Sequence, residues 1–190
     1  MTRPPIALRA PLGPDDVERL RAGDQVLLSG IVYTARDAAH ERLVHLLTEG
    51  KPLPVDLRGH VIYYCGPTPA RPGRPIGSAG PTTASRMDHY TPSLLAYGVR
   101  GMIGKGRRSR EVREAIRRCR AVYLGAVEGT AALLGERVRE AEVVAFADLG
   151  TEAIHRLVIE EFPVVVVNDI AGGDLYEEGQ ARYRRGGTEH

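Results

Sequence analysis

Apolar positions in the second half of the chain follow two patterns, short continuous runs and runs with a helical period. The runs VVAF and VVVV are apolar at every position, as strands are when both faces of their sheet are covered. This pattern predicts strands at residues 101–103, 121–124, 143–146 and 164–167, and helices at 109–119, about 130–136 and 151–160. Strands that alternate with helices in this way predict an α/β fold.

The first half of the chain is richer in strands and irregular segments. Its pattern predicts strands at 6–9, 26–32 and 60–65, a short helix that begins near Pro14, and a helix from Thr34 to about residue 49. Residues 66–85 contain four glycines and five prolines, which predicts a long irregular loop, and Thr91-Pro92 begins another short helix. We therefore expect a mixed sheet layer beside the α/β half.

Length and composition suit one globular domain. The chain has 190 residues, of which 43% are apolar. We expect the domain over residues 1–176 and a flexible C-terminal tail, rich in arginine and glycine, over 177–190. No apolar run approaches the ~20 residues that a membrane helix needs, and the first residues lack the apolar core of a signal peptide. These features predict a cytoplasmic protein with no membrane partner.

Charge is nearly balanced, with 26 basic and 24 acidic residues and a net charge of +2. Such a balance gives no global field that would attract nucleic acid. Residues 100–120 do hold eight arginines and one lysine. However, Glu111 and Glu114 interrupt this run, and no aromatic residues are interleaved for base stacking. We therefore favour a solvated helix face or a subunit contact over a nucleic-acid site.

The two cysteines, Cys65 and Cys119, lie 54 positions apart and form no metal-binding motif. We interpret them as free and mostly buried thiols. Two cysteines alone cannot ligate an iron–sulfur cluster. The sequence therefore predicts no metal site in this chain.

Two segments carry an arginine suited to binding an anion, one at a predicted helix start and the other after a pair of glycines. In residues 34–40, Arg36 and Asp37 begin a helix directly after a strand, where free backbone N–H groups and an arginine fork suit a carboxylate. Alternatively, Asp37 only complements the helix dipole and Arg36 points to water. In residues 77–88, glycines and four hydroxyl side chains precede Arg86. They suit an anion cradle, or a hydroxyl-capped helix start without a ligand.

A third segment, residues 103–106, places Lys105 between two glycines where a strand ends. Lys105 is one of only two lysines in the chain. Its compact charge and long reach suit a carboxylate or phosphate, although an ordinary surface turn would look the same. Arg36, Arg86 and Lys105 together match a substrate with two carboxylates.

The motifs TARDAAH, GSAGPTTASRMD and IGKG stand in this order, followed by DLGTEA at 148–153 and Phe162-Pro163. Over roughly residues 23–176 the chain resembles the β subunit, or C-terminal domain, of iron–sulfur-dependent class I fumarases and L-tartrate dehydratases. The resemblance implies a swivelling β/β/α three-layer domain with a mixed sheet. It also implies a hydro-lyase in which a partner α subunit holds a [4Fe–4S] cluster through three cysteines, in an α2β2 assembly that is active only as a whole.

The same resemblance implies roles for individual residues. Arg36, Arg86 and Lys105 would hold the substrate carboxylates, with Thr83 beside them, and Thr82 would be the group that abstracts a proton. The expected reaction is the reversible hydration of fumarate to L-malate. The alternatives are an L-tartrate dehydratase, another hydroxy-dicarboxylate hydro-lyase, or a dicarboxylate-binding module without catalysis. Residues 127–130 depart from the glycine-rich, uncharged turn expected there, which leaves the exact substrate open.

Overall fold

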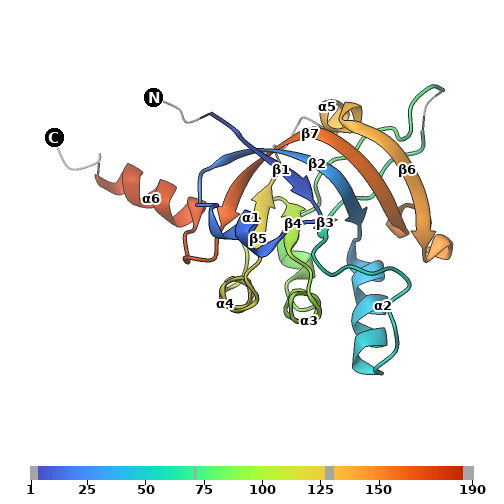
Figure 1. Ribbon diagram of the computed structural model, residues 1–190, viewed down its shortest axis with the longest axis horizontal. Helices are drawn as coiled ribbons and strands as arrows, with labels where there is room; N and C mark the ends of the chain where they lie inside the picture. Colours follow the sequence, from blue (N-terminus) through green and yellow to red (C-terminus); the bar gives the residue numbers. More distant parts are fainter. Residues whose placement is uncertain (1–3, 71, 127–130, 186–190) are drawn as a thin grey trace.

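The computed structural model describes residues 4–70, 72–126 and 131–185 of the chain (Figure 1). The strands are β1 Ile6–Ala10, β2 Gln25–Thr34, β3 Val61–Tyr63, β4 Gly101–Gly104, β5 Val122–Gly125, β6 Val138–Ala145 and β7 Ile154–Asn168. The helices are α1 Pro14–Glu18, α2 Asp37–Thr48, α3 Thr91–Tyr97, α4 Arg110–Cys119, α5 Ala131–Glu136 and α6 Leu175–Arg185, with the short 3-10 turns η1 Ala84–Met87 and η2 Ala147–Glu152.

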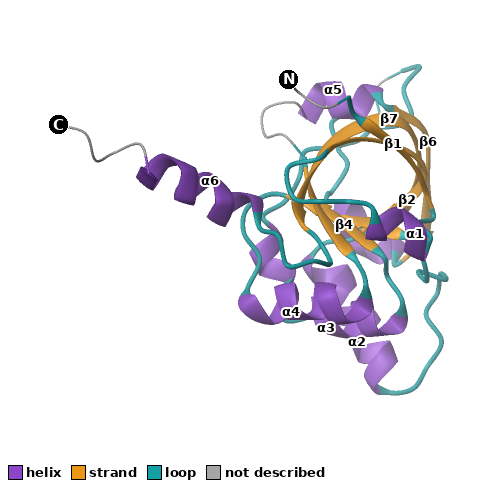
Figure 2. Ribbon diagram, turned by 60° about the vertical axis from the view of Figure 1, so that its left-hand side comes forward, coloured by secondary structure: helices purple, strands orange, loops and turns teal. Residues whose placement is uncertain are grey.

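The strands form one mixed sheet of seven strands in the order β1-β2-β3-β4-β5-β7-β6. Strands β1 to β5 run parallel to one another, whereas β7 pairs antiparallel with β2, β5 and β6. Because β7 contacts both β2 and β5, the sheet closes on itself, and Figure 2 shows the strands curled around a common interior. The predicted α/β fold with a mixed sheet is confirmed.

Two apolar clusters fill the layers of this fold. Residues around β3 show how they are divided, because Val61, Tyr63 and Cys65 face the inner cluster and Ile62 and Tyr64 face the outer one. The inner cluster lies between opposite parts of the curled sheet, and the outer cluster lies between the sheet and helices α2, α3 and α4 (Figure 2). Both faces of the parallel strands are therefore buried, which explains their continuous apolar runs and produces the β/β/α layering.

The helix predicted at residues 151–160 is wrong. Most of that segment belongs to β7, a strand of fifteen residues that follows the η2 turn. Its first half pairs with β2 on one side and β6 on the other, as in Val158 opposite Ile31 and Glu140. Hydrogen bonds to two strands that are distant in the sequence outweigh the local helical pattern. For the same reason β6 is longer than the strand predicted at 143–146, and it ends one residue earlier.

Of two helix starts predicted from the sequence, that of α2 differs from the structure and that of α4 is confirmed. Thr34, predicted to begin a helix, is the last residue of β2, and its hydroxyl accepts the N–H of His155 at 3.0 Å. Helix α2 begins at Asp37, with Arg36 at the N-cap. By contrast, Ser109 caps α4 as expected, because its hydroxyl oxygen accepts the N–H of Val112 at 3.2 Å.

The C-terminal segment forms a helix that projects from the body of the molecule (Figure 2). Residues 177–185, assigned from the sequence to a tail, belong to this helix, α6; residues 186–190 lie outside the described part of the chain. The side chain of Asp174 anchors its first turn by accepting the N–H groups of Tyr176 and Glu177 at 2.9 and 3.2 Å. Within the described residues, each helix is too short or too polar to cross a bilayer.

Candidate functional site

The carboxyl ends of the parallel strands β2, β3 and β4 lie along one edge of the sheet, and the three motif segments follow them. Thr82 lies between the ends of β3 and β4: its N–H donates to the Tyr64 carbonyl at 2.6 Å, and its carbonyl accepts the Lys105 N–H at 3.2 Å. The N–H of Ala84 then donates to the Lys105 carbonyl at 2.8 Å. These backbone bonds fix the Thr82–Thr83 pair against Lys105. Ligand sites of parallel sheets typically form at such an edge.

The packing around Gly104 explains why the second residue of the IGKG motif is a glycine. A Cβ atom on Gly104 would lie 2.8 Å from Cδ2 of Tyr64 and 3.2 Å from Cβ of Ala84. Both distances are shorter than ordinary carbon contacts, so a side chain here would push the segment around Thr82 away from β4. The glycine therefore permits the close packing that holds Thr82 beside Lys105.

The two predicted arginines meet on a shared carboxylate. Nε and Nη2 of Arg86 donate to the two oxygens of Asp37, each at 2.9 Å. Nη2 of Arg36 lies 4.0 Å from the same carboxylate and 3.4 Å from Oε1 of Glu152. Glu152 also accepts the N–H of Ala38 at 3.0 Å, so its carboxylate occupies the start of helix α2. We call Arg36, Asp37, Arg86 and Glu152 the arginine–carboxylate cluster.

A buried arginine connects the segments that carry Arg86 and Lys105. The Arg108 side chain is inaccessible to solvent, and its Nε donates to Oδ1 of Asp88 at 2.7 Å. Its other nitrogens donate to the hydroxyls of Thr91 at 2.7 Å and Tyr64 at 3.2 Å. The guanidinium also lies over the rings of Tyr64 and Tyr123. Since Asp88 follows Arg86 and Arg108 follows Lys105 in the sequence, this pair holds the η1 turn against the turn after β4.

His40 lies one helical turn after Arg36 and is fully buried. Its Nδ1 is 2.8 Å from the Arg36 carbonyl oxygen, so Nδ1 carries the proton and donates it to that oxygen. Burial lowers the pKa of His40 from 6.5 to about 4. The ring is therefore neutral at pH 7 and adds no charge to the arginine–carboxylate cluster.

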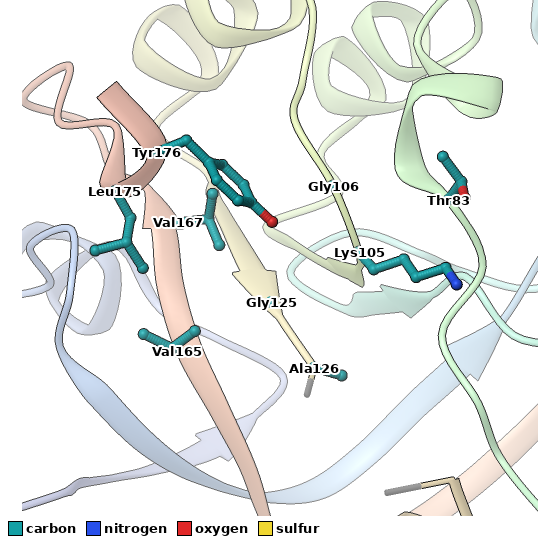
Figure 3. Close-up of a pocket in the computed structure, with 9 residues that line it drawn as sticks. All are labelled: Thr83, Lys105, Gly106, Gly125, Ala126, Val165, Val167, Leu175 and Tyr176. Carbon is teal, nitrogen blue, oxygen red and sulfur yellow. The ribbon is translucent and has the colours of Figure 1, made fainter. Parts of the chain in front are cut away.

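A cavity of about 560 Å³ opens beside Lys105, between the ends of β4 and β5 and the first turn of α6 (Figure 3). Its polar side chains are Thr83, Lys105 and Tyr176, and the Tyr176 hydroxyl points toward the turn that carries Lys105 (Figure 3). The remaining wall is formed by Gly106, Gly125, Ala126, Val165, Val167 and Leu175. The cavity thus joins a cationic, hydroxyl-bearing end to an apolar wall.

The five predicted site residues fall into two neighbouring groups. Thr82, Thr83 and Lys105 are joined by backbone pairing, and of the five only Thr83 and Lys105 are found among the described residues that line the cavity. Arg36 and Arg86 are joined through Asp37. The η1 turn links the groups, because Arg86 lies on it four positions after Thr82.

Four further residues lie at or beside the site and were not predicted from the sequence to belong to it. The sequence pattern indicates Asp37 only as a complement to the helix dipole and predicts no role for Glu152, Arg108 or Tyr176. Glu152 lies in the DLGTEA segment, and Arg108 directly precedes the Ser109 cap, so both stood close to recognised signals. Their partners, however, lie far away in the sequence and could not be inferred from spacing.

The cysteines of this chain do not fit an iron–sulfur cluster. Cys65 lies in the inner apolar cluster, where burial raises the pKa of its thiol to about 12, and Cys119 lies at the end of α4. A cluster requires several thiolates converging on one point. In the described part of the chain, no group of three or more His, Cys, Asp or Glu side chains is placed to hold a metal ion.

Several arginines of the basic stretch at 100–120 make contacts within the chain. Nε of Arg110 donates to Glu114 at 2.8 Å, and Nη1 of Arg113 donates to Glu177 at 2.6 Å and to Asp174 at 3.1 Å. Arg113 thereby ties α4 to the first turn of α6.

Residues 127–130, where the sequence departs from the expected glycine-rich turn, lie outside the described residues.

Comparison with protein-family models matches residues 2–179 to a family described as the fumarase C-terminus. The chain is 40% identical over 153 residues to "Fumarate hydratase 1, mitochondrial" of Leishmania major. It has the same identity over the same length to "Fumarate hydratase class I, anaerobic" of Escherichia coli. In both cases the match covers 80% of this chain, which spans 28% of the length of these relatives.

A third relative is similar along most of its own length. The "Putative L(+)-tartrate dehydratase subunit beta" of Methanocaldococcus jannaschii is 36% identical over 169 residues. The match covers 86% of this chain and 87% of that protein.

Proposed function

The chain belongs to the fumarase C-terminus family, and from this premise we propose that it is the β subunit of a [4Fe–4S]-dependent hydro-lyase that reversibly hydrates fumarate to L-malate. The proposal assigns the cluster to a partner α subunit, because the cysteines of this chain do not fit one. It takes residues 1–176 as the unit that contributes to the active site. Two copies of each subunit, α2β2, are the proposed assembly.

One observation supports the proposal most strongly, the insertion of residues 82–84 between the ends of β3 and β4. It brings Thr82 and Thr83 against Lys105 at the sheet edge, and the η1 turn continues from there to Arg86. A hydroxyl and several cations at one edge suit a small substrate with two carboxylates. Fumarate and malate are such substrates.

The proposed chemistry follows from the charges involved. Removal of a proton from the carbon beside a malate carboxylate spreads negative charge onto that carboxylate. Lys105, Arg36 and Arg86 would stabilise this charge more strongly than they stabilise the bound substrate, which lowers the barrier. Thr82 would accept the proton. A threonine hydroxyl is a weak base, so it must pass a proton onward to a neighbouring group as it accepts one.

L-tartrate is the second candidate substrate, and the match to the tartrate dehydratase β subunit over 87% of its length favours it. L-malate and L-tartrate differ in a hydroxyl group, which a clamp that binds only the carboxylates does not contact. The proposed clamp therefore accommodates both, and their discrimination is assigned to the partner chain.

The test is co-expression with an α chain of the family, cluster reconstitution without oxygen, and an assay of fumarate, L-malate and L-tartrate. We expect hydration of fumarate by the complex and none by either chain alone. A complex that acts only on tartrate would establish the second candidate, and a complex inactive on all three would refute both. Thr82→Val should lower kcat by roughly 10²–10⁴-fold, whereas Thr48→Val on the exposed end of α2 should not. A near-normal kcat for Thr82→Val would remove Thr82 from the proton-abstracting role.

A further inference from the structure

The arginines of the arginine–carboxylate cluster are already matched by carboxylates of their own chain. Arg86 donates two hydrogen bonds to the Asp37 carboxylate, and Arg36 contacts both Asp37 and Glu152. Two positive and two negative side chains sum to zero. A substrate dianion approaching this cluster therefore meets no net attraction from the four side chains together, even though the arginines are the groups proposed to bind it.

The contact between Arg86 and Asp37 has the geometry of a bound ligand. A carboxylate held by two parallel N–H···O bonds of 2.9 Å is the arrangement that an arginine uses for a substrate carboxylate. The pair is also accessible, since 51% of the Arg86 side chain and 31% of the Asp37 side chain are exposed. The Arg108–Asp88 pair contrasts with it, because the Arg108 side chain is wholly enclosed and cannot exchange its partner.

The two acids of the cluster are held differently. One oxygen of Glu152 accepts the Ala38 N–H, so this carboxylate is fixed at the start of α2 while the other oxygen meets Arg36. Both oxygens of Asp37 are engaged by Arg86. An incoming carboxylate can therefore replace Asp37 on Arg86 while Glu152 keeps Arg36 in place.

We propose that Asp37 is an internal stand-in for a substrate carboxylate: it holds Arg86 in a binding geometry in the empty protein and yields the arginine fork when a dicarboxylate enters. This inference rests on the proposed function, since it takes Arg86 as a substrate-binding residue. Its consequence is that Asp37 competes with the ligand. Neutralising Asp37 removes the competitor and leaves the cluster with a charge of +1, so it should strengthen the binding of dicarboxylates.

The experiment measures succinate binding to the full chain by titration calorimetry in a phosphate-free buffer. Asp37→Asn should bind succinate about tenfold more tightly than the unmodified chain, the order expected from releasing one charge-assisted pair. The matched control is Asp56→Asn, because Asp56 accepts a similar fork from Arg58, at 2.9 and 2.8 Å, away from the cluster. The control should bind succinate as the unmodified chain does.

Equal or weaker succinate binding by Asp37→Asn, or no detectable binding by this variant, would overturn the inference. Asp37→Ser provides a second neutral side chain that suits a helix start, and the same gain is expected from it. If both variants fail to fold, the pair is structural and the inference is also overturned. Acetate separates the two proposals: a gain in succinate binding by a chain that binds acetate as tightly as succinate supports the stand-in role and counts against a dicarboxylate site. An active α-containing complex whose Asp37→Asn chain shows no gain would refute the stand-in role alone.

Discussion

Removal of the charge on Asp88 should destabilise the protein far more than the same change at an exposed aspartate. Asp88 is the counter-charge of Arg108, at 2.7 Å, and it also accepts the N–H of Ser109 at 2.7 Å. The Arg108 side chain is 0% exposed and that of Asp88 14%. Asp88→Asn leaves a buried guanidinium without a full counter-charge, a change that should lower the free energy of unfolding by roughly 3 kcal/mol.

The assay is urea unfolding of Asp88→Asn beside Asp56→Asn. Asp56 also accepts two side-chain bonds from an arginine, but more than half of each partner's side chain is exposed, so the loss of this charge should leave the midpoint nearly unchanged. Asp88→Asn should also lower kcat/KM of an assembled enzyme, because the η1 turn and the Lys105 turn lose their common anchor. Equal midpoints for the two variants would refute the reasoning from burial.

Three other predictions follow from single groups. Lys105→Ala should raise KM for malate and lower kcat in the assembled enzyme, and unchanged steady-state kinetics would place Lys105 outside the substrate site. Burial lowers the pKa of His40 from 6.5 to about 4, so the unfolded chain binds a proton more readily than the folded one. The free energy of unfolding should therefore fall by up to about 3 kcal/mol as the pH decreases from 6.5 to 4. In urea unfolding at several pH values, His40→Asn should lack this pH-dependent loss. With its thiol pKa raised to about 12, Cys65 should resist alkylation at pH 8 in the native protein, and rapid modification of Cys65, mapped by mass spectrometry, would show that it is not enclosed.

Sequence patterns predicted the parallel half of the fold well because those signals are local. Strands β3, β4 and β5 are buried on both faces, so their apolar runs are continuous, and α4 begins at a serine cap that is visible in the sequence. The second half of β7 was predicted from its apolar run, but its first half was predicted as a helix, because the conformation there depends on β2 and β6, which pair with it from distant parts of the chain. Glu161, with φ of 47°, interrupts the extended pattern within it, and its N–H bonds to the Ser29 hydroxyl oxygen.

In the candidate site, too, the features with a local sequence signal were predictable, and those that depend on distant contacts were not. The segments that carry Thr82 and Lys105 were recognisable as motifs, and Gly104 has a steric reason for its place in one of them. The contact between Arg86 and Asp37 joins residues 49 positions apart, and the bond from Ala38 to Glu152 joins residues 114 positions apart. Spacing alone cannot reveal such pairs, because tertiary packing brings them together. The cations were therefore predictable, and the carboxylates that balance them were not.

The most direct test of the account is a structure of this chain assembled with its proposed α partner and bound to succinate, a dicarboxylate that cannot be hydrated. The account predicts one succinate carboxylate on Lys105, the other on Arg86 in place of Asp37, and the Thr82 hydroxyl beside a central carbon of the ligand. Succinate bound without contact to any of Arg36, Arg86, Lys105 and Thr82 would contradict it.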